Sequence, residues 1–150
     1  MRLSTRGRYG LKAMIDLAMH AGEGPVPLKA VAERQGISEH YLEQLMGALR
    51  KAGLVGSVRG AQGGYSLARD PGNITAGDII RALEGPIAPV ECVDERGATP
   101  CDRVDQCVTY IVWRRLRDAM VEALDAMNLA ELAEDARRRS GTASRHMYYI

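Results

Sequence analysis

All three cysteines of the chain lie in one polar segment, ECVDERGATPCDRVDQCV, which covers residues 91–108. Eight residues separate Cys92 from Cys101, and five separate Cys101 from Cys107. Three thiols cannot all pair in disulfides, and thiolates are the usual ligands of iron–sulfur clusters and of tetrahedral zinc. We therefore interpret residues 85–108 as a cofactor-binding loop that supplies three metal ligands and needs a fourth.

Two other interpretations of the cysteines stay open. The segment has neither C-x2-C spacing nor the paired motifs of a zinc ribbon, which disfavours a zinc finger or ribbon. Three unliganded surface thiols are a poorer alternative, because exposed free cysteines are readily oxidised. We expect the acidic neighbours to keep the loop solvated when it is empty; they are Glu91, Asp94, Glu95, Asp102 and Asp105.

The composition is that of an ordinary globular protein, long enough for one domain or for a small domain with an appended helix. The chain has 150 residues, of which 46% are apolar and 26% are charged. Its first residues contain no continuous apolar run, and the stretch AMIDLAM is too short to span a bilayer. We therefore expect a cytoplasmic protein with no membrane partner, in a compartment where thiols stay reduced.

Charge is distributed unevenly about a net charge of +1. Residues 1–75 carry ten Lys and Arg against six Asp and Glu, whereas residues 76–150 carry ten against thirteen. A basic N-terminal half suits an anionic partner such as nucleic acid, but this imbalance needs a structural motif to support it.

That motif is the order of the elements in the first 84 residues. Apolar spacing and turn residues predict four helices, over 7–21, 28–35, 38–52 and 75–83, and two strands, over 54–58 and 65–67. Gly36 ends the second helix, Ser38 caps the third, and Thr75 caps the fourth. The strands flank a glycine-rich tip, RGAQGG. This order predicts a mainly α fold with a small β-hairpin wing, a winged helix-turn-helix that binds double-stranded DNA with residues 1–84.

The third helix is the predicted recognition helix. With its leucines facing the core, Glu43 could accept a hydrogen bond from cytosine and Gln44 could pair with adenine. Arg59 at the glycine-rich tip could enter a narrow minor groove. The full set of predicted DNA contacts is Ser38, His40, Tyr41, Glu43, Gln44, Arg50, Arg59, Gly60 and Gln62. A plain solvated helix and a plain turn are the alternatives for each element taken alone.

A long helix is predicted over residues 105–127, and its apolar side needs a surface to bury against. That side carries Val112, Leu116, Ala119, Met120, Ala123 and Met127. A homodimer that pairs this helix with its copy is the simplest solution, and folding back onto its own domain is the alternative. We expect residues 105–135 to form the dimerisation region, with Asn128 capping a short final helix, and residues 136–150 to form a mobile tail.

Three stretches resemble the IscR-like iron–sulfur cluster regulators of the Rrf2-type winged-helix family: MRLSTRGRYGLKAM, VPLKAVAERQGISEHYLEQLMGALRKAGLVGSVRGAQGGY and CVTYIVWRRLRD. The resemblance covers about residues 1–135. It implies a homodimeric transcription regulator that carries a [2Fe-2S] cluster on Cys92, Cys101 and Cys107 and controls iron–sulfur cluster assembly genes. It also implies that Glu43 occupies the position at which cluster occupancy alters the choice of DNA site.

The sequence departs from the family pattern at the fourth cluster ligand. Tyr110 stands where the family has a histidine three residues after the third cysteine. Arg8 and Lys12 occupy the region from which other relatives take a carboxylate or histidine of the partner chain. The fourth ligand is therefore open among an acid such as Asp102 or Asp105, Tyr110, a residue of the partner chain and an exchangeable small molecule.

Two other functions compete with cluster sensing. A thiol-redox or nitric-oxide-sensing repressor of the same fold would use the cysteines without a stable cluster. An iron–sulfur carrier or redox subunit would belong to a different class. The sequence has no glycine-rich nucleotide loop and no Ser, His and Asp set, so we expect no enzyme activity.

Overall fold

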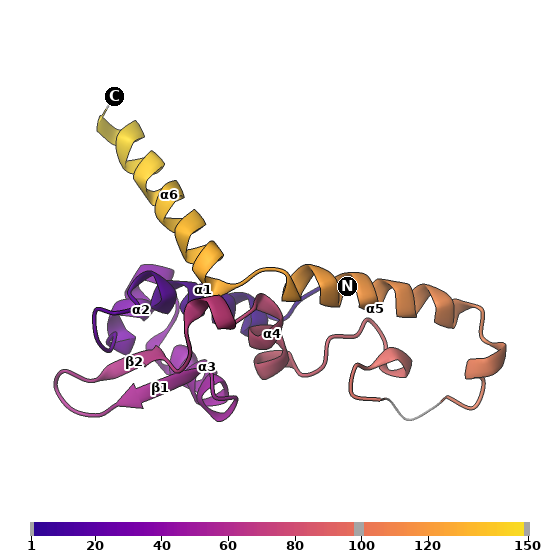
Figure 1. Ribbon diagram of the computed structural model, residues 1–150. Coiled ribbons are helices and arrows are strands. Elements are labelled where there is room, and N and C mark those ends of the chain that lie inside the picture. The colour runs from indigo at the N-terminus through magenta and orange to yellow at the C-terminus, as the bar shows by residue number, and fades with distance from the viewer. Residues whose placement is uncertain (1, 98–100, 149–150) are drawn as a thin grey trace.

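The computed structural model describes residues 2–97 and 101–148, and it consists of a helical body from which two helices extend (Figure 1). The body contains α1 to α4 and a two-stranded hairpin. Helix α5 runs away from the body above the loop that carries the cysteines, and α6 projects from the body in another direction (Figure 1). None of the helices in the described ranges combines the length and the apolar character that crossing a membrane requires.

The four predicted helices of the body are confirmed. They are α1 (Thr5–Met19), α2 (Leu28–Gln35), α3 (Glu39–Lys51) and α4 (Ala76–Glu84). Ser38 Oγ accepts a hydrogen bond from the Tyr41 amide at 3.2 Å, and Gly36 ends α2 in the left-handed conformation. Thr75 and Asp78 form the reciprocal capping box at the start of α4, with both hydrogen bonds at 3.0 Å.

The wing is an antiparallel hairpin of β1 (Val55–Val58) and β2 (Gly64–Leu67). Strand β2 also pairs with the loop before α2, because Val26 and Tyr65 exchange two main-chain hydrogen bonds of 2.8 Å. A side chain at Gly64 would collide with the carbonyl of Val26, so only glycine allows this close approach. The loop before α2 is thereby fastened to the wing.

A single apolar core lies between α1, α3, α4 and the beginning of α6. Its fully buried side chains include Met14, Leu17, Leu42, Leu45, Met46, Leu49, Ile79 and Leu129. The chain has no phenylalanine, so leucine, isoleucine and methionine fill this core. The stripe of α3 that the sequence assigns to the core is the stripe that is buried, which leaves the opposite side of α3 free.

Helix α5 spans Thr109–Asp125 and is shorter than predicted at both ends. Residues 104–106 form a separate 3-10 turn (η3, Val104–Gln106), and Cys107 is extended, which breaks the helix there. The predicted apolar side is divided. Leu116 and Met120 are half-buried, and Met120 lines a pocket with Ile80 of α4, whereas Val112, Ala119, Ala123 and Met127 are exposed.

Helix α6 spans Leu129–Tyr148, so the final helix is far longer than predicted and includes most of the segment assigned to a tail. Asn128 caps it as predicted, since Asn128 Oδ1 accepts from the Glu131 amide at 3.0 Å. Leu129 and Ala133 are buried. Ion pairs of Asp135 with arginines three and four residues further on support the next turns, a stabilisation that apolar periodicity does not reveal.

Candidate DNA interface and cysteine segment

The exposed side of α3 presents polar side chains in a row. His40, Glu43, Gln44 and Arg50 are all exposed, while Leu42, Leu45, Met46 and Leu49 on the other side are inaccessible to solvent. The Nε2 atoms of His40 and Gln44 lie 3.3 Å apart, so these neighbours on successive turns share a hydrogen bond. The row offers both donors and acceptors, as contact with base edges in the major groove requires.

Tyr41 differs from the other predicted contacts because it is half-buried against α1. Its hydroxyl lies 3.2 Å from Thr5 Oγ1, and its ring meets the ring of Tyr9 edge to face at a centroid distance of 6.2 Å. These contacts fix the start of α3 against the first turns of α1. The neighbouring Ser38 remains exposed at the N-terminus of α3.

The wing extends the polar surface of α3. Arg59, Gly60 and Gln62 are exposed at the hairpin tip, and Arg50 Nη1 donates to Ser57 Oγ at 3.2 Å, which joins the end of α3 to β1. A groove runs between α2, the start and end of α3, and the hairpin, and three cations line it: Lys29, Arg50 and Arg59. Sequence reasoning missed Lys29, although a lysine in the first turn of the first motif helix is a signal for a phosphate contact.

Two of the three cysteines line one pocket of about 370 Å³. Half-buried Cys92 and exposed Cys101 share this pocket with Tyr110 and Arg117. Among the candidates for the fourth ligand, Tyr110 lies in this lining together with the acids Asp94 and Glu95, whereas Asp102 and Asp105 are exposed outside it. Residues 98–100 of the same loop lie outside the described residues.

Cys107 stands apart from that lining. Its Sγ lies 3.1 Å from Thr109 Oγ1, and hydrogen bonding by Thr109 and by the Tyr110 amide lowers the pKa of the Cys107 thiol below its usual value. A lowered pKa enlarges the thiolate fraction, and the thiolate is the form that binds metals and reacts with oxidants.

The donor set fits an iron–sulfur cluster in kind but is not assembled in this conformation. In the described part of the chain, no three Cys, His, Asp or Glu side chains come together closely enough to hold a metal ion. A cluster on Cys92, Cys101 and Cys107 would need the three sulfurs to converge, which they do not do in the described residues.

The loop is fastened to the body by an arginine that sequence reasoning missed. Arg81 of α4 donates to both carboxylate oxygens of Glu95, at 2.7 to 3.1 Å, and to both oxygens of Asp125, at 2.8 and 2.9 Å. Glu95 also accepts from the Ile87 amide at 2.7 Å. These hydrogen bonds lower the pKa values of Glu95 and Asp125, so both stay charged. Glu95 and Asp125 lie 14 and 44 positions away from Arg81 along the chain, so no local sequence pattern predicts these ion pairs.

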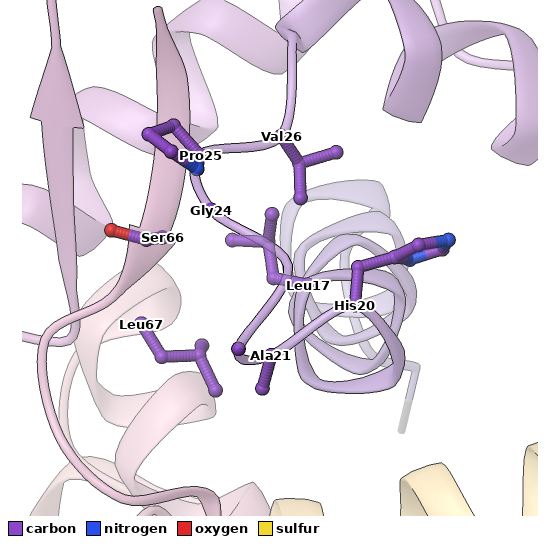
Figure 2. A pocket seen from close by; sticks show the side chains of 9 residues that line it. Leu17, His20, Ala21, Gly24, Pro25, Val26, Ser66 and Leu67 are labelled. Carbon is purple, nitrogen blue, oxygen red and sulfur yellow. The ribbon is translucent and has the colours of Figure 1, made fainter.

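A further pocket lies where the end of α1 meets the wing (Figure 2). Leu17, Val26 and Leu67 give it apolar walls, and Figure 2 shows the His20 ring pointing away from Ser66 and Leu67. The imidazole is already engaged, because His20 Nδ1 lies 2.9 Å from the main-chain oxygen of Asp16. This pocket lies at the contact between α1 and β2.

The helix-turn-helix, its wing and the polar surface that they share define a class, the winged-helix transcription regulators that bind DNA. The family model Rrf2, described as an iron-dependent transcriptional regulator, matches residues 3–135. The protein belongs to this Rrf2 family, as the sequence motifs implied.

Similar proteins carry two different regulatory names. CymR of Bacillus subtilis (strain 168), an HTH-type transcriptional regulator, is 50% identical over 150 residues, which are all of both chains. IscR of Xenorhabdus nematophila, also an HTH-type transcriptional regulator, is 45% identical over 135 residues, 90% of this chain and 80% of that protein.

Solved structures agree with the fold. The structure of CymR, described as the global cysteine regulator of B. subtilis, gives a TM-score of 0.73 at 51% identity and covers 89% of this chain and 97% of that one. IscR of T. potens gives a TM-score of 0.73 at 52% identity, covering 91% and 88%. The relatives are transcription regulators, which confirms the predicted fold class and the prediction that the protein is not an enzyme.

Proposed function

We propose that this Rrf2 regulator is a cytoplasmic sensor of iron–sulfur cluster status that controls iron–sulfur cluster assembly genes. In this proposal Cys92, Cys101 and Cys107 bind a [2Fe-2S] cluster, and the cluster-bound and cluster-free forms differ in DNA binding. The observation that carries the proposal is the shared pocket of Cys92 and Cys101, with the low-pKa thiol of Cys107 at the root of α5. The similarity to IscR proteins supports the same assignment.

The DNA-binding surface in this proposal is the outer side of α3 together with the wing tip. Glu43 and Gln44 read base edges, Arg59 enters the minor groove, and Lys29 and Arg50 contact phosphates. His40, Gly60 and Gln62 complete the exposed surface, and Ser38 and Tyr41 lie at the start of α3. Glu43 is the position at which cluster occupancy would change the choice of site.

The working form is a homodimer in which α5 pairs with its copy. The side of α5 opposite the body carries an exposed apolar stripe: Val108, Val112, Ala119, Ala123 and Ala126. Val108 and Val112 are 78% and 54% exposed, and a contiguous apolar stripe of this kind marks an interaction surface more often than single exposed apolar residues do. A two-fold pairing would bury this stripe against itself and set the spacing of the two recognition helices.

A second candidate function is thiol-based sensing, including sensing of nitric oxide, by the same cysteines without a cluster. Two observations favour it. The described sulfurs do not converge on a metal position. CymR, which is 50% identical over the whole chain, is described as a cysteine regulator. The lowered pKa of the Cys107 thiol, caused by hydrogen bonding from Thr109 and Tyr110, would favour its reactive thiolate form.

Anaerobic purification separates the two candidates. A cluster gives a red-brown protein with visible charge-transfer bands and about two iron and two sulfide per chain. Each of Cys92→Ala, Cys101→Ala and Cys107→Ala should remove those bands, whereas the control variant Ser66→Ala, on β2 outside the cysteine segment, should keep them. Tyr110→Phe tests the fourth ligand through a shift of the bands.

The contrary result is a colourless protein. Stoichiometric zinc in that protein would overturn the cluster assignment. A metal-free protein that loses DNA binding on mild oxidation and regains it on reduction would establish the second candidate. A gel shift with the promoter upstream of its own gene provides the DNA readout for both cases.

A further inference from the structure

A series of hydrogen bonds, carried between them by α4 and the start of α1, joins the cysteine segment to the recognition helix. The series begins at Glu95, three residues after Cys92, whose carboxylate is held by the Arg81 guanidinium at 2.7 Å. The Arg81 side chain is 31% exposed and the Glu95 side chain 20%, so water only partly screens this ion pair. Motion of the segment around Cys92 therefore displaces Arg81 or breaks its hold.

Helix α4 carries the connection from Arg81 to α1. Glu84 lies three residues after Arg81, one turn along the helix, and accepts a hydrogen bond from the Ser4 amide at 2.8 Å as well as one from the Ser4 hydroxyl. The preceding carbonyl, of Leu83, accepts from Arg6 Nε at 3.2 Å. The first turn of α1 is thus attached to the end of α4 by three hydrogen bonds.

Two glycines bring α1 close enough to α4 for these bonds to form. A Cβ atom at Gly7 would lie 2.9 Å from Glu84 Oε1, and one at Gly10 would collide with the Leu83 side chain. The two helices are therefore in tight contact along this edge. Packed interiors resist compression, so a displacement of α4 is passed to the start of α1.

The first turn of α1 in turn holds the recognition helix. Thr5 lies between Ser4 and Arg6, and its Oγ1 is 3.2 Å from the hydroxyl of Tyr41 in the first turn of α3. The edge-to-face packing of Tyr9 on Tyr41 adds a second contact at the same point. Glu43 and Gln44 follow within one turn of Tyr41 on the exposed side.

We propose that the Arg81–Glu95 ion pair, α4 and residues 4–6 of α1 form the mechanical connection that makes the recognition helix respond to the state of the cysteine segment. The proposal rests on the proposed sensing function, and it assigns positioning roles to Arg81, Glu95 and Thr5. Asp125 keeps Arg81 in place: its carboxylate occupies the space that a side chain at Gly77 would fill, and it also accepts from Thr75 Oγ1 at the start of α4. Energetic coupling between the cysteine segment and the recognition helix is established by measuring it directly.

The measurement is the ratio of operator affinities of the cluster-bound and cluster-free full-length protein. Allosteric ratios are typically about 5- to 150-fold, and Glu95→Gln and Thr5→Val should each reduce the wild-type ratio to about twofold or less. Because both changes interrupt one series of contacts, the double variant should lose no more than either single one. Asp135→Asn, which removes the two ion pairs of Asp135 within α6, is the matched control and should keep the wild-type ratio. Iron content is checked for each variant.

Amide NMR spectra of the cluster-free protein provide a second readout that needs no cofactor. Glu95→Gln should shift the amide signals of Ser4, Thr5 and Tyr41, and Asp135→Asn should leave them in place. If Glu95→Gln keeps the full affinity ratio of the wild type, the connection is overturned and the sensing function stands. If the affinity ratio of the wild type is one, the sensing function is overturned instead. In that case the NMR spectra test the connection alone, and unshifted Ser4 and Tyr41 signals in Glu95→Gln overturn it as well.

Discussion

Asp16 of α1 and Arg34 of α2 form a two-pronged ion pair, with Nε and Nη2 of Arg34 donating to the two carboxylate oxygens at 2.9 and 2.7 Å. The Asp16 side chain is only 3% exposed, whereas the Arg34 side chain is 40% exposed. Gln35 Nε2 donates to the same carboxylate at 3.0 Å. Asp16 is the buried charged residue among the described residues, and it fixes the first helix of the DNA-binding motif to α1.

Asp16→Asn should lower the free energy of unfolding by about 1–3 kcal/mol, because the amide NH2 group cannot accept the hydrogen bond from Arg34 Nη2 and the amide has no charge to pair with the guanidinium. Urea unfolding followed by circular dichroism measures the difference. Glu33→Gln, an exposed change on α2, is the control and should lie within about 0.5 kcal/mol of the wild type. An Asp16→Asn protein as stable as the control would show that the pair contributes nothing to docking α2.

Acid should weaken the attachment of the cysteine loop. The Arg81 guanidinium is the main cause of the lowered pKa values of Glu95 and Asp125, whose ordinary values are 4.5 and 3.8. A carboxylate with a lowered folded-state pKa adds stability above its ordinary value, and that stability is lost as pH falls through the folded-state value. The stability difference between the wild type and Arg81→Gln should therefore be constant near neutrality and shrink below about pH 4.5.

Unfolding midpoints in urea between pH 7 and pH 3 measure this trend. Because this stability difference comes from the ion pairs of Arg81, high salt should reduce the difference between the wild type and Arg81→Gln at pH 7. A difference that grows as pH falls would mean that Arg81 acts through something other than these two carboxylates.

Gln44→Ala should weaken binding to a specific operator by about 1–3 kcal/mol and leave binding to random DNA almost unchanged, because Gln44 is proposed to read a base edge. Fluorescence anisotropy with both DNAs measures the two affinities at one salt concentration. Glu33→Gln on α2, whose side chain lies outside the predicted contact set, is the control. Equal losses of affinity for the two DNAs would show that Gln44 contacts phosphate and does not read a base edge.

Arg50→Ala should weaken binding to both DNAs by a similar factor, since Arg50 is proposed to contact phosphate from its position beside Ser57. The slope of log affinity against log salt should fall in magnitude by about one. Arg138→Ala on α6 is the matched loss of one positive charge outside the interface. An unchanged salt slope in Arg50→Ala would exclude the phosphate contact.

Val112→Asp should dissociate the homodimer, because it places a charge in the apolar stripe that is proposed to pair across the two-fold axis. Sedimentation velocity at several protein concentrations measures the change of mass. Arg114→Asp alters the same helix away from the stripe and should remain dimeric. A dimer that survives Val112→Asp would place the interface elsewhere on the molecule.

Local signals account for most of the DNA-binding body. The caps at Ser38 and Thr75 and the left-handed Gly36 mark helix ends through hydrogen bonds that span only three or four residues, so they can be read without a fold. The 3.6-residue period of α3 separates Leu42 and Leu45 from Glu43 and Gln44 in the same way. The start of α5 was misplaced because a 3-10 turn and an extended Cys107 interrupt a stretch whose composition favours helix.

The arrangement of the cysteine segment could not be predicted in the same way. Its cysteines are visible in the sequence, but whether their sulfurs meet depends on the path of a loop with few regular hydrogen bonds. The structure places Cys92 and Cys101 in one pocket beside Tyr110, and it places Cys107 with Thr109. The length of α6 was missed for a related reason, because ion pairs and docking on α1 stabilise it where apolar periodicity is weak.

The sequence by itself determined the elements of this protein, the polar side of its recognition helix and the confinement of its thiols to one segment, since all three depend on neighbours within a few positions along the chain. Only the tertiary structure decided which distant charges meet: Asp16 with Arg34, and Arg81 with both Glu95 and Asp125. The reason is physical. An ion pair between residues 14 to 44 positions apart forms only where the packing of helices brings the two side chains within a few ångströms, and no local preference encodes that distance.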